Sequence, residues 1–127
     1  MRAPLALELA ALPKAVPEAR RAVRAYLGVP CPDVQLCVSE LLANVIRHVG
    51  EGTPVSLRVH GTGGGRARVE VTDREPHAWL VVRHAGAEEE SGRGLLLLDS
   101  VALRWGVRQE TDGKTVWCDV PLSAGSG

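Results

Sequence analysis

The chain has 127 residues, which fits one domain, and 45% of them are hydrophobic, which is enough to build a core. Fifteen basic and fifteen acidic residues cancel, so no charge surplus predicts direct binding to nucleic acid or to an anionic membrane. No apolar run approaches the roughly 20 residues of a membrane-crossing helix, and the first residues lack the pattern of a secretory signal. The three cysteines lack metal-site spacing, which favours reduced thiols in a cytoplasmic protein.

The first part of the chain predicts a strand followed by two helices. Leucines alternate over residues 5–9, which is the periodicity of a strand. From Pro17 to Leu27 the apolar residues follow one helical stripe, and Gly28 marks the end of that helix. A second helix is predicted from an N-cap at Asp33 to Val49, with Gly50 as its terminator.

The rest of the chain predicts two hairpins, separated by a loop and a third helix. In chain order, the expected segments are a hairpin of strands over 55–59 and 67–71 with its turn at 61–65, a loop over 73–91 with a short strand at 79–82, a helix from Gly94 to about Leu103, and closing strands at 105–109 and 115–120 around a turn at Asp112-Gly113.

The order of these elements indicates the fold class. Consecutive hairpins predict an α+β two-layer sandwich, in which three helices cover one face of a mixed, mostly antiparallel sheet. A doubly wound dinucleotide-binding fold would need strands that alternate with helices, and this order does not offer them. We predict a single domain over residues 1–122 and a flexible tail over 123–127.

One edge of the second predicted helix carries three polar side chains of different chemistry. Glu40, Asn44 and His48 are four residues apart, so each returns to nearly the same side of the helix, with an offset of about 40°. Carboxylate and amide oxygens suit Mg²⁺, and a general base can act beside a bound phosphate. The spacing alone, however, favours the solvated polar face of an amphipathic helix.

Three further segments have weak signals of their own. Asp73 ends a predicted strand, where its carboxylate can accept a hydrogen bond from an adenine amino group, although Asp is common wherever a strand meets a loop. Gly92-Arg93-Gly94 opens the third predicted helix, where backbone N–H groups can approach a phosphate. Thr115 follows the Gly-Lys of the last hairpin turn and could place a hydroxyl near a nucleotide base.

The order of these segments resembles the nucleotide-binding boxes of the GHKL (Bergerat-fold) ATP-binding superfamily. In its length and in the residues of these segments, the chain is most similar to the anti-sigma-factor serine/threonine kinases, over about residues 5–122. The matching segments are Ser39-Glu-Leu-Leu-Ala-Asn44 with His48, Gly92-Arg-Gly-Leu-Leu-Leu, Trp105-Gly, and Gly113-Lys-Thr-Val-Trp117.

The resemblance implies a Bergerat fold that binds ATP with Mg²⁺. It also implies a role for each matched residue: Glu40 as the general base for an attacking hydroxyl, Asn44 as the Mg²⁺ ligand, His48 near the phosphates, Asp73 on adenine, Gly92, Arg93 and Gly94 in the phosphate loop, and Thr115 beside the base with an ordered water.

The implied function is transcription control through partner switching. An anti-sigma-factor kinase phosphorylates Ser or Thr of an anti-sigma-factor antagonist and also sequesters a sigma factor, so the expected partners are proteins. Dimers are common in the resembled family, and the exposed first strand would allow a homodimer through edge pairing.

The segment after Asp73 departs from the family pattern. The usual Asp-x-Gly-x-Gly is Asp73-Arg74-Glu75-Pro76-His77 here, so the two glycines that let the backbone pass close to a nucleotide are absent. This departure favours an alternative, a non-catalytic regulator with a degenerate nucleotide site that binds a sigma factor or another partner. A histidine-kinase catalytic domain shares the fold, but about sixteen residues before the first predicted helix are too few for the helical segment that carries the phosphorylated histidine.

Overall fold

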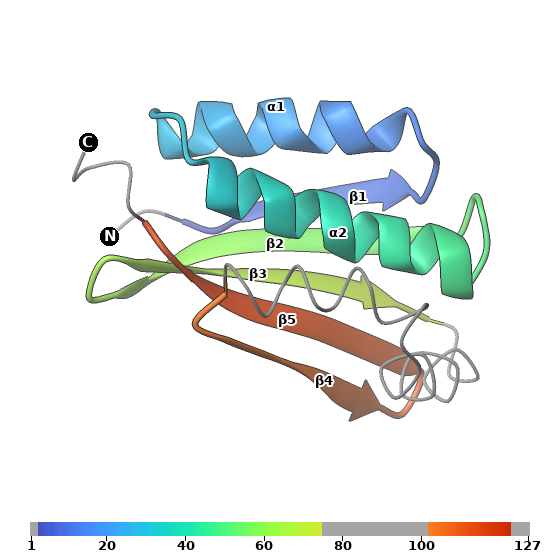
Figure 1. Ribbon diagram of the computed structural model, residues 1–127. Helices are drawn as coiled ribbons and strands as arrows, with labels where there is room; N and C mark the ends of the chain where they lie inside the picture. The colour runs from blue at the N-terminus through green and yellow to red at the C-terminus, as the bar shows by residue number, and fades with distance from the viewer. Residues whose placement is uncertain (1–2, 75–101, 123–127) are drawn as a thin grey trace.

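The computed structural model of the chain describes residues 3–74 and 102–122, in which two helices lie on one face of a five-stranded sheet (Figure 1). This arrangement confirms an α+β fold. The elements in chain order are β1 (Leu5–Ala10), α1 (Ala15–Leu27), α2 (Pro32–His48), β2 (Pro54–Gly63), β3 (Arg66–Asp73), β4 (Arg104–Glu110) and β5 (Gly113–Pro121).

The strands of the sheet follow the order β1-β2-β3-β5-β4, and each of the four neighbouring pairs is antiparallel. The prediction of a mixed sheet is therefore wrong for the described strands. The physical reason lies in the connections. Each hairpin reverses the chain, and α1 and α2 together return it to the end of the sheet where β1 finished, with Ala10 opposite Pro54.

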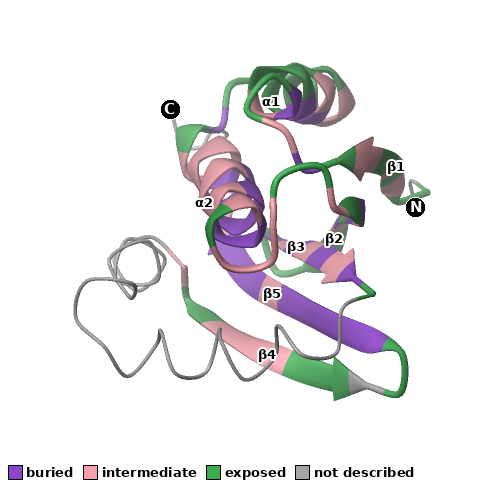
Figure 2. Ribbon diagram, turned by 90° about the vertical axis from the view of Figure 1, so that its right-hand side faces the viewer, coloured by how far each residue is buried: buried purple, intermediate pink, exposed green. Residues whose placement is uncertain are grey.

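The core lies between the two helices and the sheet. It is built from valine, leucine, alanine and cysteine side chains, in a chain of which only 3% of the residues are aromatic. Figure 2 shows the buried residues on the facing sides of α2 and the sheet. Full burial of each such valine or leucine contributes about 1.5–3 kcal/mol of hydrophobic stabilisation. Neither described helix is long and apolar enough to cross a membrane.

The ends of the two helices confirm the predicted stop of α1 and correct the predicted start of α2. α1 begins at Ala15, so Pro17 lies in its first turn, where its missing N–H is not needed. Gly28 ends α1 in the left-handed conformation, with φ of 81°, as predicted. The N-cap of α2 is Cys31 and its first residue is Pro32, so the prediction of Asp33 as N-cap is wrong. Asp33 instead lies in the first turn, where its charge favours the helix dipole.

The two hairpins are confirmed, with tighter turns than predicted. β2 runs on to Gly63 through an irregularity in pairing, which leaves Gly64 and Gly65 as the first turn. β5 already begins at Gly113, so the second turn is Thr111-Asp112. The predicted strand at 79–82, the tail at 123–127 and nearly all of the loop and third helix lie outside the described residues. The described end of that predicted helix, residues 102–103, is not helical.

Candidate functional site

The polar edge predicted from the sequence lies on one flank of the buried face of α2. Helical spacing places Glu40, Asn44 and His48 together there, beside the core residues Leu41 and Val45. Asn44 is only 4% exposed, whereas Glu40 and His48 are half-buried. A buried amide next to a partly accessible carboxylate differs from the solvated polar face that spacing alone favoured.

The opposite flank of α2 faces α1. The side-chain amide of Gln35 donates to the carbonyl oxygen of Arg20 (3.2 Å), and a guanidinium nitrogen of Arg20 donates to the hydroxyl of Ser39 (3.3 Å). Since α2 also packs on β3 and β5, the edge with Glu40, Asn44 and His48 lies on the side of α2 away from α1. This side is over the β3–β5 half of the sheet (Figure 1).

Asp73 is the last residue of β3, and it pairs with a residue that was not among the predicted site residues. Lys114, the second residue of β5, is its partner across the two strands, and Nζ of Lys114 donates to a carboxylate oxygen of Asp73. The side chains are 0% and 1% exposed respectively. The sequence offered one signal, because Lys114 is one of only two lysines among fifteen basic residues.

Close approach of two backbones explains the glycine before Lys114. A Cβ at Gly113 would overlap the carbonyl oxygen of Asp73 and lie 2.8 Å from the Cα of Arg74. Gly113 is therefore required by space at the junction of β3 and β5, whereas the sequence suggested only turn chemistry.

Thr115 lies on the other face of the sheet. Side chains alternate along a strand, so Lys114 and Thr115 point to opposite faces. The hydroxyl of Thr115 is 2.7 Å from that of Thr72, which also alternates with Asp73. The structure thus brings Asp73 together with Lys114, and it does not bring Thr115 to Asp73. Gly92, Arg93 and Gly94 lie outside the described residues.

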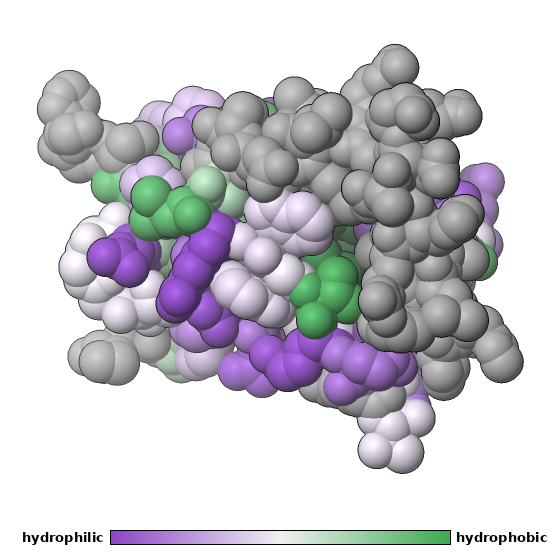
Figure 3. Space-filling model, turned by 60° about the horizontal axis from the view of Figure 1, so that its bottom comes forward, coloured by the Kyte–Doolittle hydropathy of each residue, from purple (hydrophilic) through white to green (hydrophobic). Residues whose placement is uncertain are grey.

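A second charged cluster covers the face of the sheet away from the helices. Asp119 of β5 accepts hydrogen bonds from Arg68 of β3 (2.6 and 2.9 Å) and from Arg104 of β4 (2.9 Å). The Arg68 guanidinium also lies 4.4 Å from the centre of the Trp117 ring, and that of Arg104 lies 5.9 Å from it. Figure 3 brings the β4 side of the molecule forward, where hydrophilic residues lie beside small hydrophobic patches.

Electrostatics at Asp119 follow from this geometry. The hydrogen bond from Arg68, and after it the one from Arg104, lower the pKa of Asp119 to about 2, against burial, which acts to raise it. The same hydrogen bond raises the pKa of Arg68. The sequence shows the alternation of these residues but does not give the register that joins them.

The three cysteines are reduced and buried. A hydrogen bond with Cys37, followed by burial, raises the pKa of the Cys118 thiol well above its ordinary value. Because the thiolate is the reactive form, Cys118 is not suited to act as a nucleophile.

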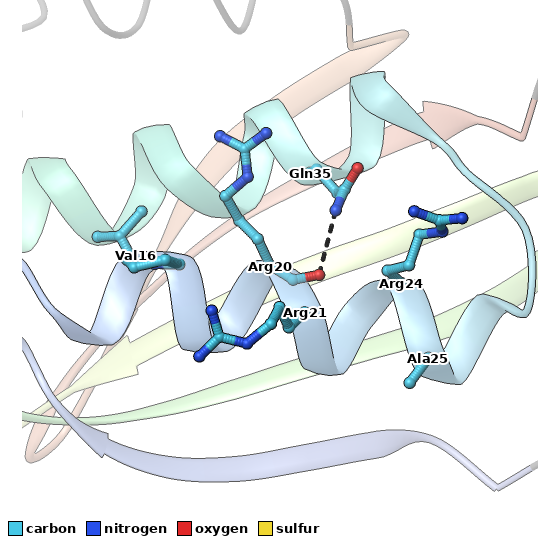
Figure 4. A pocket seen from close by; sticks show the side chains of 7 residues that line it. Val16, Arg20, Arg21, Arg24, Ala25 and Gln35 are labelled. Carbon is cyan, nitrogen blue, oxygen red and sulfur yellow. Dashed lines mark hydrogen bonds between the residues drawn. The ribbon is translucent and has the colours of Figure 1, made fainter.

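A groove of about 580 Å³ lies on the outer surface between α1 and α2. Arg20, Arg21 and Arg24 line it, with Val16, Pro17, Ala25 and Gln35 as the other lining residues. Figure 4 shows Arg20 and Arg24 reaching from α1 towards α2, on either side of Gln35 in this view. The groove is on the α1 flank of α2, so it is distinct from the edge that carries Glu40 and Asn44.

Comparison with known proteins gives three findings. The model of a family described as a histidine kinase-like ATPase domain matches residues 9–119. An uncharacterized protein of Streptomyces coelicolor is 46% identical over 83 residues, which is 65% of this chain and 79% of that protein. A solved structure of the mycobacterial sensor histidine kinase MprB is similar with a TM-score of 0.55 and 18% identity, over 95% of this chain and 97% of that chain. At this identity the likeness to MprB shows the fold alone.

Proposed function

Because the chain belongs to the histidine kinase-like ATPase domain family, which confirms the GHKL resemblance, we propose that it binds ATP with Mg²⁺ as part of a regulatory protein. One observation carries this proposal. A buried amide and a half-buried carboxylate on α2, and a buried carboxylate at the end of β3, all belong to the same side of the domain. These groups are of the types that hold a metal–nucleotide complex.

Each described residue has a role in the proposed site. Asn44 would supply one oxygen ligand to Mg²⁺, and a single protein ligand is enough because this ion keeps waters and takes phosphate oxygens. Asp73 would accept a hydrogen bond from the adenine amino group. His48 would lie near the phosphates, and Glu40 is accessible enough to take a proton from a hydroxyl. ATP would supply the phosphoryl group for transfer.

Isothermal titration with Mg-ATP tests nucleotide binding. We expect micromolar affinity that is lost in Asn44→Ala, while Gln35→Ala retains it, because Gln35 is an amide on the opposite flank of the same helix. Thermal unfolding of both variants checks that they are folded. Absence of binding by the wild type up to millimolar Mg-ATP, or equal loss in both variants, contradicts the proposal.

We further propose that the reaction is phosphorylation of Ser or Thr in an anti-sigma-factor antagonist, which controls transcription through partner switching. The support is the position of Glu40 one helical turn before Asn44, on the same helix edge, together with the motif order in the sequence. Transfer of labelled phosphate from ATP to the purified antagonist is the measurement. Glu40→Gln should abolish transfer while Mg-ATP binding remains. Undiminished transfer in that variant would remove Glu40 from its role as the base.

The alternative is a non-catalytic regulator with a degenerate nucleotide site. Two observations favour it. The carboxylate of Asp73 is already held by Lys114, and both glycines are missing from the segment that follows Asp73. A stable complex with a purified sigma factor, without phosphate transfer at saturating Mg-ATP, would support this alternative over the kinase.

For the protein partner, we propose that an acidic segment docks in the groove between α1 and α2. The support is charge complementarity, because three arginines line a groove with apolar side chains on a chain of zero net charge. Replacing Arg20, Arg21 and Arg24 by Gln should weaken binding of the purified antagonist or sigma factor and reduce its salt dependence. The same change at the exposed Arg58 and Arg66 is the control. Equal weakening by both sets argues against the groove.

We also propose a homodimer through β1. β1 pairs only with β2 among the described strands and so forms one edge of the sheet. Sedimentation over a range of concentrations would report a monomer throughout if this proposal is wrong.

A further inference from the structure

β4 lies at one border of the described sheet, where a further strand could be added. In the part of the chain that the structure describes, β4 pairs with β5 alone, and β1 forms the opposite border (Figure 1). β4 has seven residues, none of them proline, and it pairs with β5 along its whole length without an irregularity. The outer edge of such a strand exposes a row of backbone N–H and C=O groups, which is a template for another extended segment.

The accessible charge along this border is positive. Arg104, Gly106 and Arg108 alternate along the face of the sheet away from the helices. Arg104 donates to Asp119, and a guanidinium nitrogen of Arg108 lies 3.9 Å from a carboxylate oxygen of Glu70. The two arginine side chains are 66% and 48% exposed, whereas their two carboxylate partners are 4% and 15% exposed. Because the carboxylates are covered and the guanidinium groups are accessible, an approaching segment meets positive charge.

Gly106 brings an aromatic ring to the same border. A Cβ at Gly106 would lie 3.0–3.3 Å from three atoms of the Trp117 ring, so this ring of the neighbouring strand occupies the place of the missing side chain. A side chain opposite Gly106 on an added strand would therefore meet the indole. On the helix side of β4, Trp105 and Val107 are half-buried, which suits apolar side chains at the alternate positions of that strand.

The arginines also decide against a second copy of β4 as the added strand. A twofold antiparallel pairing centred on Gly106 would place Arg104 of one copy opposite Arg108 of the other, on the same face. Like charges directly opposite each other destabilise a pair of strands, whereas opposite charges stabilise it. An acidic strand fits this border, and a copy of β4 does not.

We propose that β4 is a docking edge for an extended segment of a protein partner that alternates acidic and apolar residues, with acidic side chains opposite Arg104 and Arg108. Backbone hydrogen bonds to β4 would supply affinity, and the two arginines would select the charge of the segment. The edge uses none of the residues assigned to ATP, to phosphate transfer or to the groove between α1 and α2. It is therefore a separate interaction surface, and it does not depend on the proposed function.

Fluorescence anisotropy of a labelled synthetic peptide with the full chain tests this surface. The probe is Thr-Glu-Val-Thr-Val-Glu-Thr, and a second probe has Lys in place of both Glu. The wild type should bind the acidic probe roughly tenfold more tightly than the lysine probe, because two attractive cross-strand pairs replace two repulsive ones. Replacing Arg104 and Arg108 by Gln should weaken binding of the acidic probe about fivefold.

The matched control is the same substitution at Arg58 and Arg66, which are exposed on β2 and β3, and it should change binding by less than about twofold. Thermal unfolding checks that both double variants are folded. Equal binding of the two probes by the wild type overturns the proposal. Undiminished binding by the folded Arg104→Gln, Arg108→Gln variant overturns it as well.

Methylated probes separate strand addition from general charge attraction. Backbone N–H groups of alternate residues point to opposite edges of an extended strand, and only one of these edges pairs with β4. One acidic probe is therefore N-methylated at its residues 2, 4 and 6, and another at residues 3, 5 and 7. Strand addition predicts that one of them binds and the other does not, whereas equal binding of both contradicts it. Titration with Mg-ATP is a separate measurement, so failure of this proposal is distinct from failure of the nucleotide site.

Discussion

Two carboxylates on the same pair of strands meet basic side chains in different ways. On the helix side of the sheet, Asp73 of β3 and Lys114 of β5 form an ion pair whose two side chains are 1% and 0% exposed. On the other side, Asp119 of β5 is buried but shared by two arginines, Arg68 and Arg104, whose side chains are 24% and 66% exposed. The first pair has no contact with water, and the second cluster keeps part of its charge hydrated.

This difference predicts how each cluster responds to damage. Removal of one member of a buried pair leaves an uncompensated charge, which costs far more than the pair contributes when intact. At Asp119 the loss of one arginine leaves the other in place, and an exposed guanidinium that loses its partner returns to water at little cost. We therefore expect the Asp73–Lys114 pair to be sensitive to substitution and the cluster around Asp119 to be tolerant.

The largest expected effect is that of Lys114→Met on stability. We expect the free energy of unfolding to fall by about 3–5 kcal/mol, because Asp73 is left buried without its counter-charge. Urea unfolding at neutral pH measures this loss. Adding Asp73→Asn should recover part of it by removing the buried negative charge. Lys14→Met at an exposed position should change stability by less than about 0.5 kcal/mol. Equal effects at the two lysines would contradict the contrast between the clusters.

Gly113→Ala tests whether the strand junction that forms the buried pair is equally intolerant. The new methyl group would overlap the carbonyl oxygen of Asp73, and backbone atoms cannot move aside as a flexible side chain can. We expect a loss of about 3 kcal/mol in the free energy of unfolding. Gly61→Ala is the matched control, because its Cβ would lie 3.9 Å from the nearest atom, the carbonyl oxygen of Arg66. A small effect at both glycines would show that the junction can open.

Periodicity and turn signals were enough to predict the elements of the fold in the described regions, because each depends on neighbours within one helix or strand. The same kind of reasoning placed Glu40 and Asn44 on one helix edge, since that relation is local. The cap of α2 was misread because both Pro32 and Asp33 suit the start of a helix, and only the backbone decides which residue begins it.

The pairing of Asp73 with Lys114 could not be predicted from the sequence. Along β5 a shift of one residue exchanges the two faces of the sheet, so the choice between Lys114 and Thr115 depends on the register of β5 against β3. That register joins residues about forty positions apart in the chain, and it places Gly113 where a Cβ would overlap the backbone of Asp73. The cluster around Asp119 joins three strands and was missed for the same reason.

Lowering the pH should remove the contribution of Asp119 to the free energy of unfolding. The folded-state pKa of Asp119 is about 2, below its ordinary value of 3.8, so the unfolded chain takes up this proton first as the pH falls. The stabilisation is complete above pH 3.8 and is lost as the pH falls through about 2. The shift corresponds to about 2 kcal/mol. Urea unfolding at a series of pH values measures this loss.

Asp119→Asn is the control for that measurement. The variant should be less stable at neutral pH, and its stability should fall less steeply between pH 4 and pH 2 than that of the wild type. An identical fall in both proteins would assign the acid sensitivity to other carboxylates.

The smallest effect is expected for Gly106→Ala, which probes the tolerance of the outer face at Trp117. A Cβ at Gly106 would lie 3.0–3.3 Å from three atoms of the indole ring of Trp117. Trp117 is the residue of β5 that is paired with Gly106 of β4. The obstacle is a side chain, unlike the backbone that faces Gly113, so the ring can shift by a few tenths of an ångström. We expect a loss of roughly 1 kcal/mol in the free energy of unfolding, at the low end for overpacking. A loss as large as that of Gly113→Ala would mean that the arginines hold the Trp117 ring rigidly, and that the outer face is as unyielding as the buried pair.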